Sequence, residues 1–493
     1  MQLYPKQFLK YSTVTFIFLC LSANVFSITG NSIRFTGAAP EYRGLYIEFN
    51  CYRNFIIPET ERVAVMLIDN NGDFDFTFAM DETGYVFADL GRFRVYIYAE
   101  PGMSYTLVFP PFEPITDEQK LNPLFQPEEI PFGIKNTETQ ALNRNIIEFN
   151  DAFEYIYNTN AVSLFTSPSG NRAEELIKQM DERFTCTHPY FVLHKKYSYL
   201  KLRHLSHRTQ KKALMAHLTE CAPIYNLPVY WEIFRTLMSG YQPVNYLASS
   251  KTSLSAAINL GMPFDSIITT LLSDTLFRNR EFAETWMLFK LFESFYGKSI
   301  SEKRCMEITQ SAVEYASTEQ IRLMASLFFK KMSALRAGTA APVFSLFNRR
   351  ERTVELSDYK GKFLYLGFVH TKNYACLLDM SVIEQFEKTM KNELRIVTVV
   401  IDDDFDAMVE FMKKNSQYKW DFLHFGKQPT LLNSYAVKGA PLYYLIDPEG
   451  NLSLSPAPSP QENFRQLFAE KYLEYQRVQL RKNPPEEKSI FDW

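Results

Sequence analysis

The spacing of apolar and polar residues predicts a β-rich region at the start of the chain. From about residue 30 to residue 112, short apolar or alternating runs are separated by turn residues such as Asn71-Gly72 and Pro101-Gly102. Runs of this length and spacing are typical of strands in a small antiparallel β-sandwich; they cover 45–49, 62–68, 74–78, 93–98 and 105–109. We therefore assign residues 28–112 to an N-terminal antiparallel β-sandwich domain.

A helical pattern replaces the strand pattern after a linker. Prolines punctuate residues 113–131, which predicts an irregular connection. Apolar residues then recur at i, i+4, i+7, i+11 and i+14, which predicts one apolar helix face; they are Leu142, Ile146, Phe149, Phe153 and Ile156. Further amphipathic stretches follow without a fixed repeat of the solenoid type. We expect residues 132–335 to form a central all-α domain.

The last region alternates between strand and helix patterns. Buried strands are predicted over 361–368 and 395–401, and residues 437–447 read as a turn, a proline and another buried strand. Helices are predicted to start near 376 and to cover 381–391, 404–415 and 461–475. Alternation of this kind favours an α/β domain, which we place at residues 336–476. Residues 477–493 are expected to form a polar C-terminal tail.

Three motifs in this region resemble the redoxin branch of the thioredoxin family. They are the opening Gly338-Thr339-Ala340-Ala341-Pro342-Val343-Phe344-Ser345-Leu346, the approach Leu356-Ser357-Asp358-Tyr359-Lys360-Gly361-Lys362, and the loop Lys438-Gly439-Ala440-Pro441. The resemblance implies a C-terminal α/β thioredoxin fold. The order of the regions is also similar to that of exported redoxin proteins of Bacteroides-like bacteria. The resemblance places the family's Cys-x-x-Cys site at residues 373–376, which here read Asn373-Tyr374-Ala375-Cys376.

Asn373 stands where the family has its attacking cysteine. Disulfide exchange needs one thiolate to attack and a second thiol to resolve the mixed disulfide. An asparagine cannot attack a disulfide, so our first hypothesis is a redoxin domain without dithiol-disulfide exchange.

The same resemblance implies a binding groove beside Pro441. In the fold this proline is cis, and the residue before it, here Ala440, pairs through its backbone with an extended peptide. Tyr374 and His370 would flank the groove. We therefore expect a peptide or protein partner, and a binding module of the cell envelope.

Cys376 leaves an alternative open. A helix N-terminus lowers the pKa of a thiol, so Cys376 could act as a monothiol oxidoreductase or a peroxidase-like enzyme in envelope redox homeostasis. The peroxiredoxin loop proline is replaced by Val369-His370-Thr371, and no arginine stands nearby in the sequence. A reactive Cys376 and an inert, buried Cys376 both remain possible interpretations.

The N-terminus predicts export. Lys6 and Lys10 precede an apolar run over 14–21 and a cleavage position after Ser27. This order is typical of a signal peptide, here residues 1–27. Together with the resemblance to exported redoxin proteins of Bacteroides-like bacteria, it implies the periplasm or cell envelope of a Gram-negative bacterium. Lipidation at Cys20 is disfavoured, because Leu19 rather than a small residue precedes it. No membrane span is expected after signal cleavage.

Composition and cysteine spacing narrow the remaining possibilities. The chain has 493 residues, a net charge of -3 and 46% hydrophobic residues, which gives no reason to expect nucleic acid as a partner. Five cysteines follow the signal peptide, and one bridge, between Cys186 and Cys221, is conceivable. No motif for a metal or another cofactor is present, and the oligomeric state is open.

Overall fold

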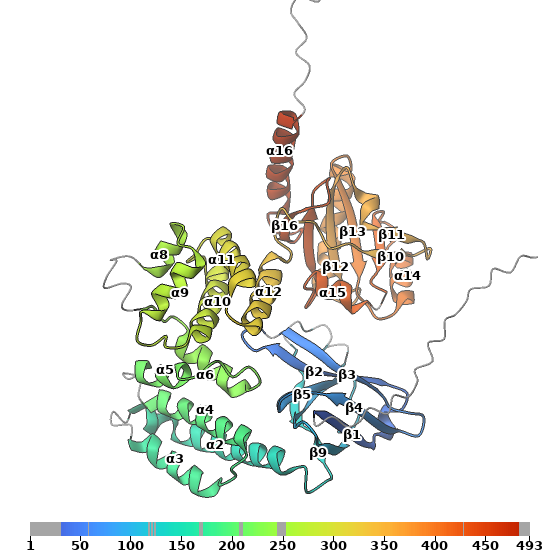
Figure 1. Cartoon of the computed structure of the whole chain (residues 1–493). Helices are drawn as coiled ribbons and strands as arrows, with labels where there is room; N and C mark the ends of the chain where they lie inside the picture. The colour runs from blue at the N-terminus through green and yellow to red at the C-terminus, as the bar shows by residue number, and fades with distance from the viewer. Residues whose placement is uncertain are drawn as a thin grey trace, which may run out of the picture.

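Three regions follow one another along the chain in a computed structural model: a sheet-rich N-terminal region, a helical middle and a C-terminal α/β domain (Figure 1). The structure describes residues 31–482, except 58, 117–118, 120–121, 123–124, 167–170, 207–210, 244–252 and 427. The expected signal peptide and Cys20 lie outside the described residues.

Two sheets share one apolar core in the N-terminal region. Their strand orders are β4-β1-β7-β9 and β3-β2-β5-β6-β8. The core between them is rich in aromatic side chains, among them Phe35, Phe49 and Tyr105. The strands are β1 (Ser32–Ala38), β2 (Tyr46–Asn54), β3 (Glu59–Leu67), β4 (Asp73–Ala79), β5 (Gly84–Leu90), β6 (Phe93–Ala99), β7 (Ser104–Val108), β8 (Glu128–Pro131) and β9 (Gly133–Ile134). A 3-10 turn, η1, covers Pro40–Tyr42.

This arrangement differs from the expected one in two ways. The pairings of β1 with β7 and of β6 with β8 are parallel, so the strands are not purely antiparallel. In addition, β8 and β9 lie in residues assigned above to the linker and to the start of the helical domain. Pro131 ends β8 at the edge of its sheet, where the missing N–H of proline breaks no ladder. The proline-rich composition therefore concealed an edge strand.

The helical region covers the outer face of the five-stranded sheet. Tyr85, Phe87 and Tyr98 of that sheet belong to the same apolar core as the helices. Asn143 of α2 joins the two regions, because its Oδ1 accepts from the Tyr98 N–H at 2.8 Å and its Nδ2 donates to the Tyr98 carbonyl at 2.9 Å. The described helices are α2 (Ala141–Thr166), α3 (Asn171–Arg183), α4 (Pro189–Ser206), α5 (Lys211–Thr219), α6 (Pro228–Met238), α8 (Leu254–Asn259), α9 (Phe264–Leu272), α10 (Arg280–Gly297), α11 (Glu302–Tyr315) and α12 (Glu319–Ser333).

The C-terminal domain is built on a seven-stranded sheet of order β11-β10-β14-β13-β12-β15-β16. Strands β12, β13 and β14 run parallel, and β15 is antiparallel to β12. The elements are β10 (Ser345–Asn348), β11 (Thr353–Glu355), η3 (Leu356–Tyr359), β12 (Phe363–Val369), α13 (Tyr374–Met390), β13 (Leu394–Val400), α14 (Phe405–Lys414), β14 (Asp421–His424), α15 (Pro429–Ser434), β15 (Leu442–Ile446), β16 (Leu452–Ala457) and α16 (Phe464–Lys482).

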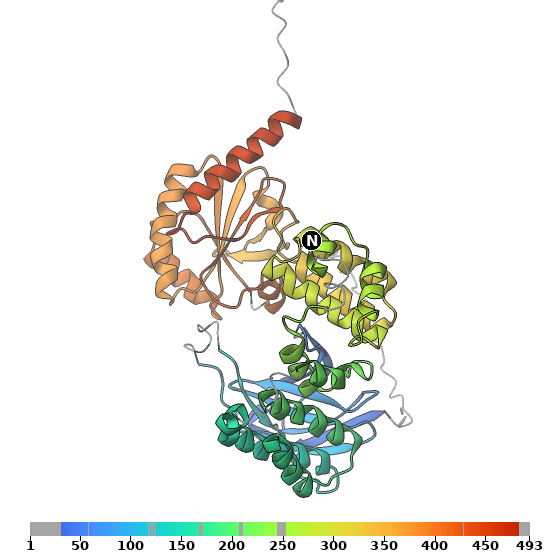
Figure 2. The ribbon, with the colours of Figure 1, turned by 90° about the vertical axis from the view of Figure 1, so that its left-hand side faces the viewer.

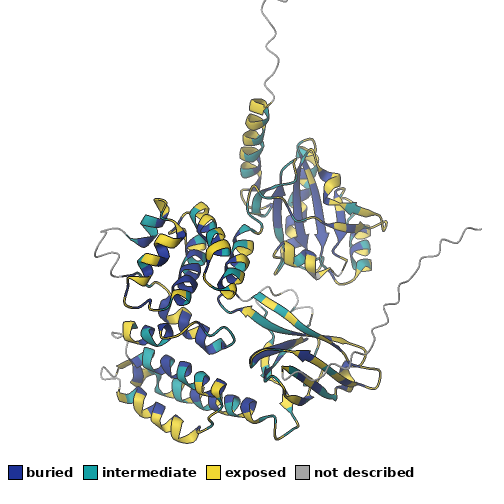
Figure 3. Ribbon diagram, in the orientation of Figure 1, coloured by how far each residue is buried: buried dark blue, intermediate teal, exposed yellow. Residues whose placement is uncertain are grey.

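Both faces of this sheet are covered, and its central strands are buried (Figure 3). Along β12, Phe363 and Tyr365 face the core that holds α13, α14 and α16. The residues that alternate with them, Leu364 and Leu366, face the second core. A continuous apolar run such as 363–369 is what a parallel strand with two covered faces requires.

Helix α16 extends further than expected. It continues to Lys482, so residues 477–482, assigned above to a polar tail, are helical. It crosses the C-terminal domain and projects beyond it (Figure 2). Only Phe464 and Phe468, near its start, are buried in the domain core.

The five described cysteines are all free, so the bridge between Cys186 and Cys221 does not form. Cys186 packs against the helical core in the loop after α3, whereas Cys221 is exposed after α5. Within the described ranges, no helix combines the length and apolarity that a bilayer crossing would require.

Candidate functional site

A pocket of about 430 Å³ opens at the carboxyl ends of β12 and β13. Parallel strands end together at this edge, so the loops that follow them meet there, which is where open α/β sheets bind ligands. The loop before β15 closes the third side because β15 is antiparallel to β12. The pocket is lined by His370, Lys372, Ile401, Asp402, Asp403, Asp404, Ala407, Phe425, Leu432, Val437, Lys438, Gly439 and Ala440.

Asn373 joins two sides of this site. It is the N-cap of α13, and its Oδ1 accepts from the Ala375 N–H at 2.9 Å. Its Nδ2 donates to the carbonyl oxygen of Ala440, also at 2.9 Å. Asparagine is among the best N-cap residues, and its amide offers an acceptor and a donor at once. One side chain therefore fixes the start of the helix and its distance from the proline loop.

The peptide bond between Ala440 and Pro441 is cis, as the family resemblance implies. Ala440 is half-buried, and among the described residues none accepts a hydrogen bond from its N–H. The loop therefore offers one open backbone donor beside the pocket, while Asn373 already occupies the neighbouring carbonyl.

Cys376 is fully buried one turn into α13. It belongs to the apolar core with Met380 and Ile383. Burial raises the pKa of its thiol to about 11, the charges of Asp379 and Asp402 act in the same direction, and a hydrogen bond from the backbone of His370 opposes them. A helix N-terminus lowers the pKa of a nearby thiol, but at this position burial raises it by more.

Asp402 holds the loop that precedes α13. Its carboxylate, in a residue only 3% exposed, accepts from the Thr371 N–H at 2.9 Å and from the Thr371 hydroxyl at 2.6 Å. Nδ1 of His370 lies 3.4 Å from the same carboxylate and accepts from the Lys372 N–H at 3.2 Å. The acid therefore orders the loop backbone. Asp404, two residues later, caps α14 by accepting from the Asp406 N–H.

A second buried carboxylate lies on the inner face of α13. Asp379 is 2% exposed and accepts from the Tyr443 hydroxyl at 2.9 Å and from Nε2 of Gln461 at 2.7 Å. Burial, together with the negative charge of Asp379, raises the pKa of Tyr443 well above its ordinary value. Sequence reasoning missed this network. The sequence did contain one indication of it: an acid, Asp379, stands three residues after Cys376 on the apolar face of the helix.

The structure brings together most of the residues singled out from the sequence. His370 and Ala440 line the pocket, Asn373 bonds to Ala440, and Cys376 lies buried below Asn373. Tyr374 does not line the pocket and is 73% exposed. With Leu377 and Leu378 it forms an exposed apolar strip at the start of α13, where Leu377 is 36% and Leu378 is 40% exposed.

In the described part of the chain, no group of three or more histidine, cysteine, aspartate or glutamate side chains could hold a metal ion.

Comparison with known proteins bears on the C-terminal domain. A family model described as thioredoxin-like matches residues 361–452. The thiol-disulfide oxidoreductase ResA of Bacillus subtilis (strain 168) is 30% identical over 125 residues, which is 25% of this chain and 69% of that protein. ResA of Bacillus cereus (strain ATCC 10987 / NRS 248) is 28% identical over 127 residues, which is 25% of this chain and 72% of that protein.

Solved structures show the same likeness over a similar share of the chain. The thioredoxin domain of a thiol-disulfide oxidoreductase from Bacteroides vulgatus is 20% identical, with a TM-score of 0.26, and covers 28% of this chain and 99% of that one. An exposed lipoprotein thioredoxin of Streptococcus pneumoniae (strain TIGR4) is 27% identical, with a TM-score of 0.24, and covers 27% of this chain and 99% of that one.

Proposed function

The chain belongs to the thioredoxin-like redoxin family, and we propose that its redoxin domain binds an extended peptide segment of a protein partner without exchanging disulfides itself. The observation that carries the proposal is the hydrogen bond from Asn373 to the carbonyl of Ala440. This bond places the Asn373 amide, which cannot act as a nucleophile, between the helix start and the proline loop. The family resemblance places the attacking thiol at this position.

The state of Cys376 supports the absence of exchange. With a pKa of about 11, roughly one thiol in ten thousand is ionised at pH 7. The side chain is also closed off from solvent. A buried thiol that stays protonated is a poor nucleophile and a poor leaving group in thiol exchange.

The surroundings of Ala440 support the binding role. A strand added at the loop would find the open N–H of Ala440. The pocket beside it, with Lys372 and Lys438 on its rim, could take one side chain of the peptide. The exposed strip of Tyr374, Leu377 and Leu378 would cover a neighbouring apolar side chain.

The alternative, a monothiol oxidoreductase or peroxidase using Cys376, fits these observations less well. It needs a solvent-accessible thiolate and a positive charge beside it, whereas the nearest charges acting on Cys376 are those of Asp379 and Asp402. No arginine lines the pocket.

The cellular setting is part of the same proposal. The signal-like pattern of residues 1–27 supports export to the periplasm or cell envelope. There we infer that the paired N-terminal sheets act as a sandwich-like support, which with the helical region carries the redoxin domain.

Two assays test the proposal separately. For exchange, the native chain is compared with Asn373→Cys and Asn373→Ser in the reduction of insulin disulfides by dithiothreitol. We expect the native chain and Asn373→Ser to match the rate without protein, and Asn373→Cys to exceed it. If the native chain accelerated the reduction of insulin, the proposal that it does not exchange disulfides would be wrong.

For binding, 12-residue peptides displayed on phage are selected on the full chain, and affinities of the selected peptides are measured by fluorescence anisotropy. Ala440→Ile, which adds bulk at the proline loop, should weaken binding at least tenfold. Ala79→Ile at the far edge of an N-terminal sheet serves as the control and should leave affinity unchanged. Equal affinities for Ala440→Ile and the native chain, or no selected peptide at all, would count against the groove.

A further inference from the structure

A second hollow, of about 350 Å³, lies on the redoxin domain between the β10–β11 turn, the end of α14 and the start of β14. It shares no lining residue with the pocket beside Ala440. Four cationic side chains and one carboxylate line it, and we call it the basic hollow; they are Arg349, Arg350, Arg352, Lys419 and Asp421. The remaining lining residues are Asn348, Met412, Ser416, Tyr418, Trp420 and Phe422.

The turn that carries the arginines has a fixed backbone. Oδ1 of Asn348 accepts from the N–H groups of Arg350 at 2.9 Å and Arg352 at 3.2 Å. The Asn348 N–H also donates to the Arg352 carbonyl, and Glu351 takes a left-handed conformation with φ 55°. A left-handed conformation is unusual for a residue other than glycine, and here it occurs in the short turn that carries the three arginines.

The four cations are not neutralised within the described chain. Their guanidinium and ammonium groups form no ion pair and no hydrogen bond with the described residues. The one lining carboxylate, Asp421, accepts from the Tyr359 hydroxyl at 3.0 Å. The whole chain carries a net charge of -3, so this clustering does not follow from composition. Unpaired like charges held together repel one another, and an anion would relieve that cost.

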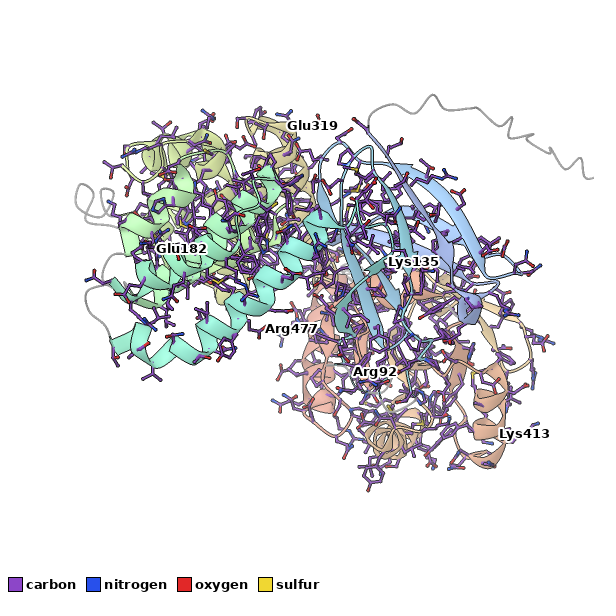
Figure 4. All side chains as sticks on the ribbon, turned by 90° about the horizontal axis from the view of Figure 1, so that it is seen from below. Arg92, Lys135, Glu182, Glu319, Lys413 and Arg477 are labelled. Carbon is purple, nitrogen blue, oxygen red and sulfur yellow. The ribbon has the colours of Figure 1, made fainter. Side chains whose placement is uncertain are left out.

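Two further lysines, Lys413 and Lys414, stand in the sequence between the lining residues Met412 and Ser416, at the end of α14. Lys413 lies on the outer rim of the C-terminal domain and points away from it (Figure 4). Lys414 lies 3.9 Å from Glu410. Both lysines lie in the last turn of α14, where positive charge interacts favourably with the helix dipole, and neither lines the basic hollow.

The floor of the hollow is rigid and apolar. Trp420 is buried and donates from Nε1 to the Thr398 hydroxyl at 2.9 Å, so its polar atom is already used. Its ring lies 4.9 Å from that of Tyr418 and 5.3 Å from that of Phe422, centroid to centroid. The polar recognition that the hollow can offer therefore comes mainly from guanidinium and ammonium groups on its rim.

We propose that the basic hollow binds a phosphate-bearing anion. Planar guanidinium groups donate two parallel hydrogen bonds to phosphate oxygens, and three arginines on one turn can hold more than one such oxygen pair. A hollow of this volume admits a phosphate group with part of the molecule that carries it. The phosphate could belong to a lipid headgroup or to a free phosphorylated molecule, and the chemistry of recognition is the same for both.

The test uses the full chain, a hollow variant and a charge-matched control. The hollow variant is Arg349→Gln with Arg350→Gln and Arg352→Gln. The control removes three exposed cations of the helical region: Lys178→Gln, Lys303→Gln and Lys331→Gln. Pyrophosphate binding is measured by calorimetry, and sedimentation with vesicles is compared between pure phosphatidylcholine and phosphatidylcholine with 30% phosphatidylglycerol, a composition chosen for the assay.

We expect the native chain and the control to bind, the hollow variant to lose at least tenfold in affinity, and 0.5 M NaCl to weaken native binding. Pyrophosphate binding supports a free phosphorylated ligand, and binding only to the anionic vesicles supports a lipid headgroup. Circular dichroism verifies that the variants fold. The proposal is overturned if the native chain binds neither probe, or if the hollow variant and the control lose affinity equally.

Discussion

The ring of Tyr443 occupies the space that a side chain at Gly367 would need. The two residues are directly paired across β12 and β15, and a Cβ at Gly367 would lie 2.7 Å from Cε1 of Tyr443. This close approach lets the tyrosine cross over β12 and donate to Asp379 on α13. The aromatic ring therefore takes the space beside Gly367, and the buried acid that it contacts comes from the helix.

Gly367→Ala should destabilise the C-terminal domain by about 1–3 kcal/mol, because the added methyl overpacks a closed core. Chemical denaturation monitored by circular dichroism measures the change. Gly297→Ala is the matched control: this glycine ends α10 with nothing within 4 Å of its Cβ direction. An unchanged midpoint for Gly367→Ala would show that Tyr443 can move aside at little cost.

The two roles of Asn373 can be separated by two substitutions. Asn373→Asp keeps an acceptor for the Ala375 N–H but cannot donate to the Ala440 carbonyl when ionised, whereas Asn373→Ala loses both bonds. Loss of the cap should cost about 1 kcal/mol, so Asn373→Ala should be less stable than the native chain by that amount or more. Asn373→Asp should retain the cap contribution, and the NMR order parameters of the 438–440 backbone should then fall, because the loop has lost its bond to the helix start. Equal order parameters for that loop in the native chain and Asn373→Asp would mean that the bond to Ala440 does not order it.

The sequence was informative where a local pattern determines the structure, and silent where contacts span long separations. The apolar run of β12 and the cis bond before Pro441 were both predicted, the first from neighbouring residues and the second from a motif. Strand β8 was missed because its pairing with β6 cannot be read from a proline-rich segment.

The candidate site shows the same limit. Asn373 and Ala440 were singled out separately, but their hydrogen bond joins residues 67 positions apart. The partners of Asp379 lie 64 and 82 positions away, and no local pattern relates them. The sequence also left open whether Cys376 is reactive or buried, because the core that buries it is built from distant segments of the domain.

Thr371→Val should destabilise the loop that leads into α13. The hydroxyl donates to the buried carboxylate of Asp402, and valine has nearly the same shape but no donor. Leaving a buried carboxylate short of a partner costs about 1–3 kcal/mol. Thr389→Val is the control, since Thr389 is exposed, its hydroxyl donates to the Gln385 carbonyl of its own helix, and it accepts only a long bond of 3.5 Å from exposed Arg465. Similar small losses in both variants, measured by thermal unfolding, would show that the Thr371 hydroxyl contributes little.

Cys376 should label slowly in the folded chain. A pKa of about 11, two units above the ordinary value of 9.0, lowers the thiolate fraction at neutral pH about 100-fold, and burial slows access further. Peptide mapping after N-ethylmaleimide treatment gives the rate, and exposed Cys221 in the same molecule serves as the internal standard. We expect Cys376 to react at least 100-fold more slowly than Cys221 and to become equally reactive on unfolding. Labelling of both at similar rates in the folded chain would support the monothiol alternative.

The raised pKa of Cys376 also predicts how stability depends on pH. The folded state binds the thiol proton more tightly than the unfolded state, so the stabilisation is fully present below about pH 9 and is lost as the pH rises from 9 to 11. The rise of the pKa from 9.0 to about 11 corresponds to at most about 3 kcal/mol of unfolding free energy. In Cys376→Ala this part of the pH dependence should disappear, although the variant is less stable throughout because it leaves a cavity. The difference in unfolding free energy between the native chain and Cys376→Ala, measured from pH 8 to pH 11, should therefore shrink as the pH rises. A constant difference over this range would show that the folded thiol titrates like a solvated one, and the case for an inert Cys376 would fail with it.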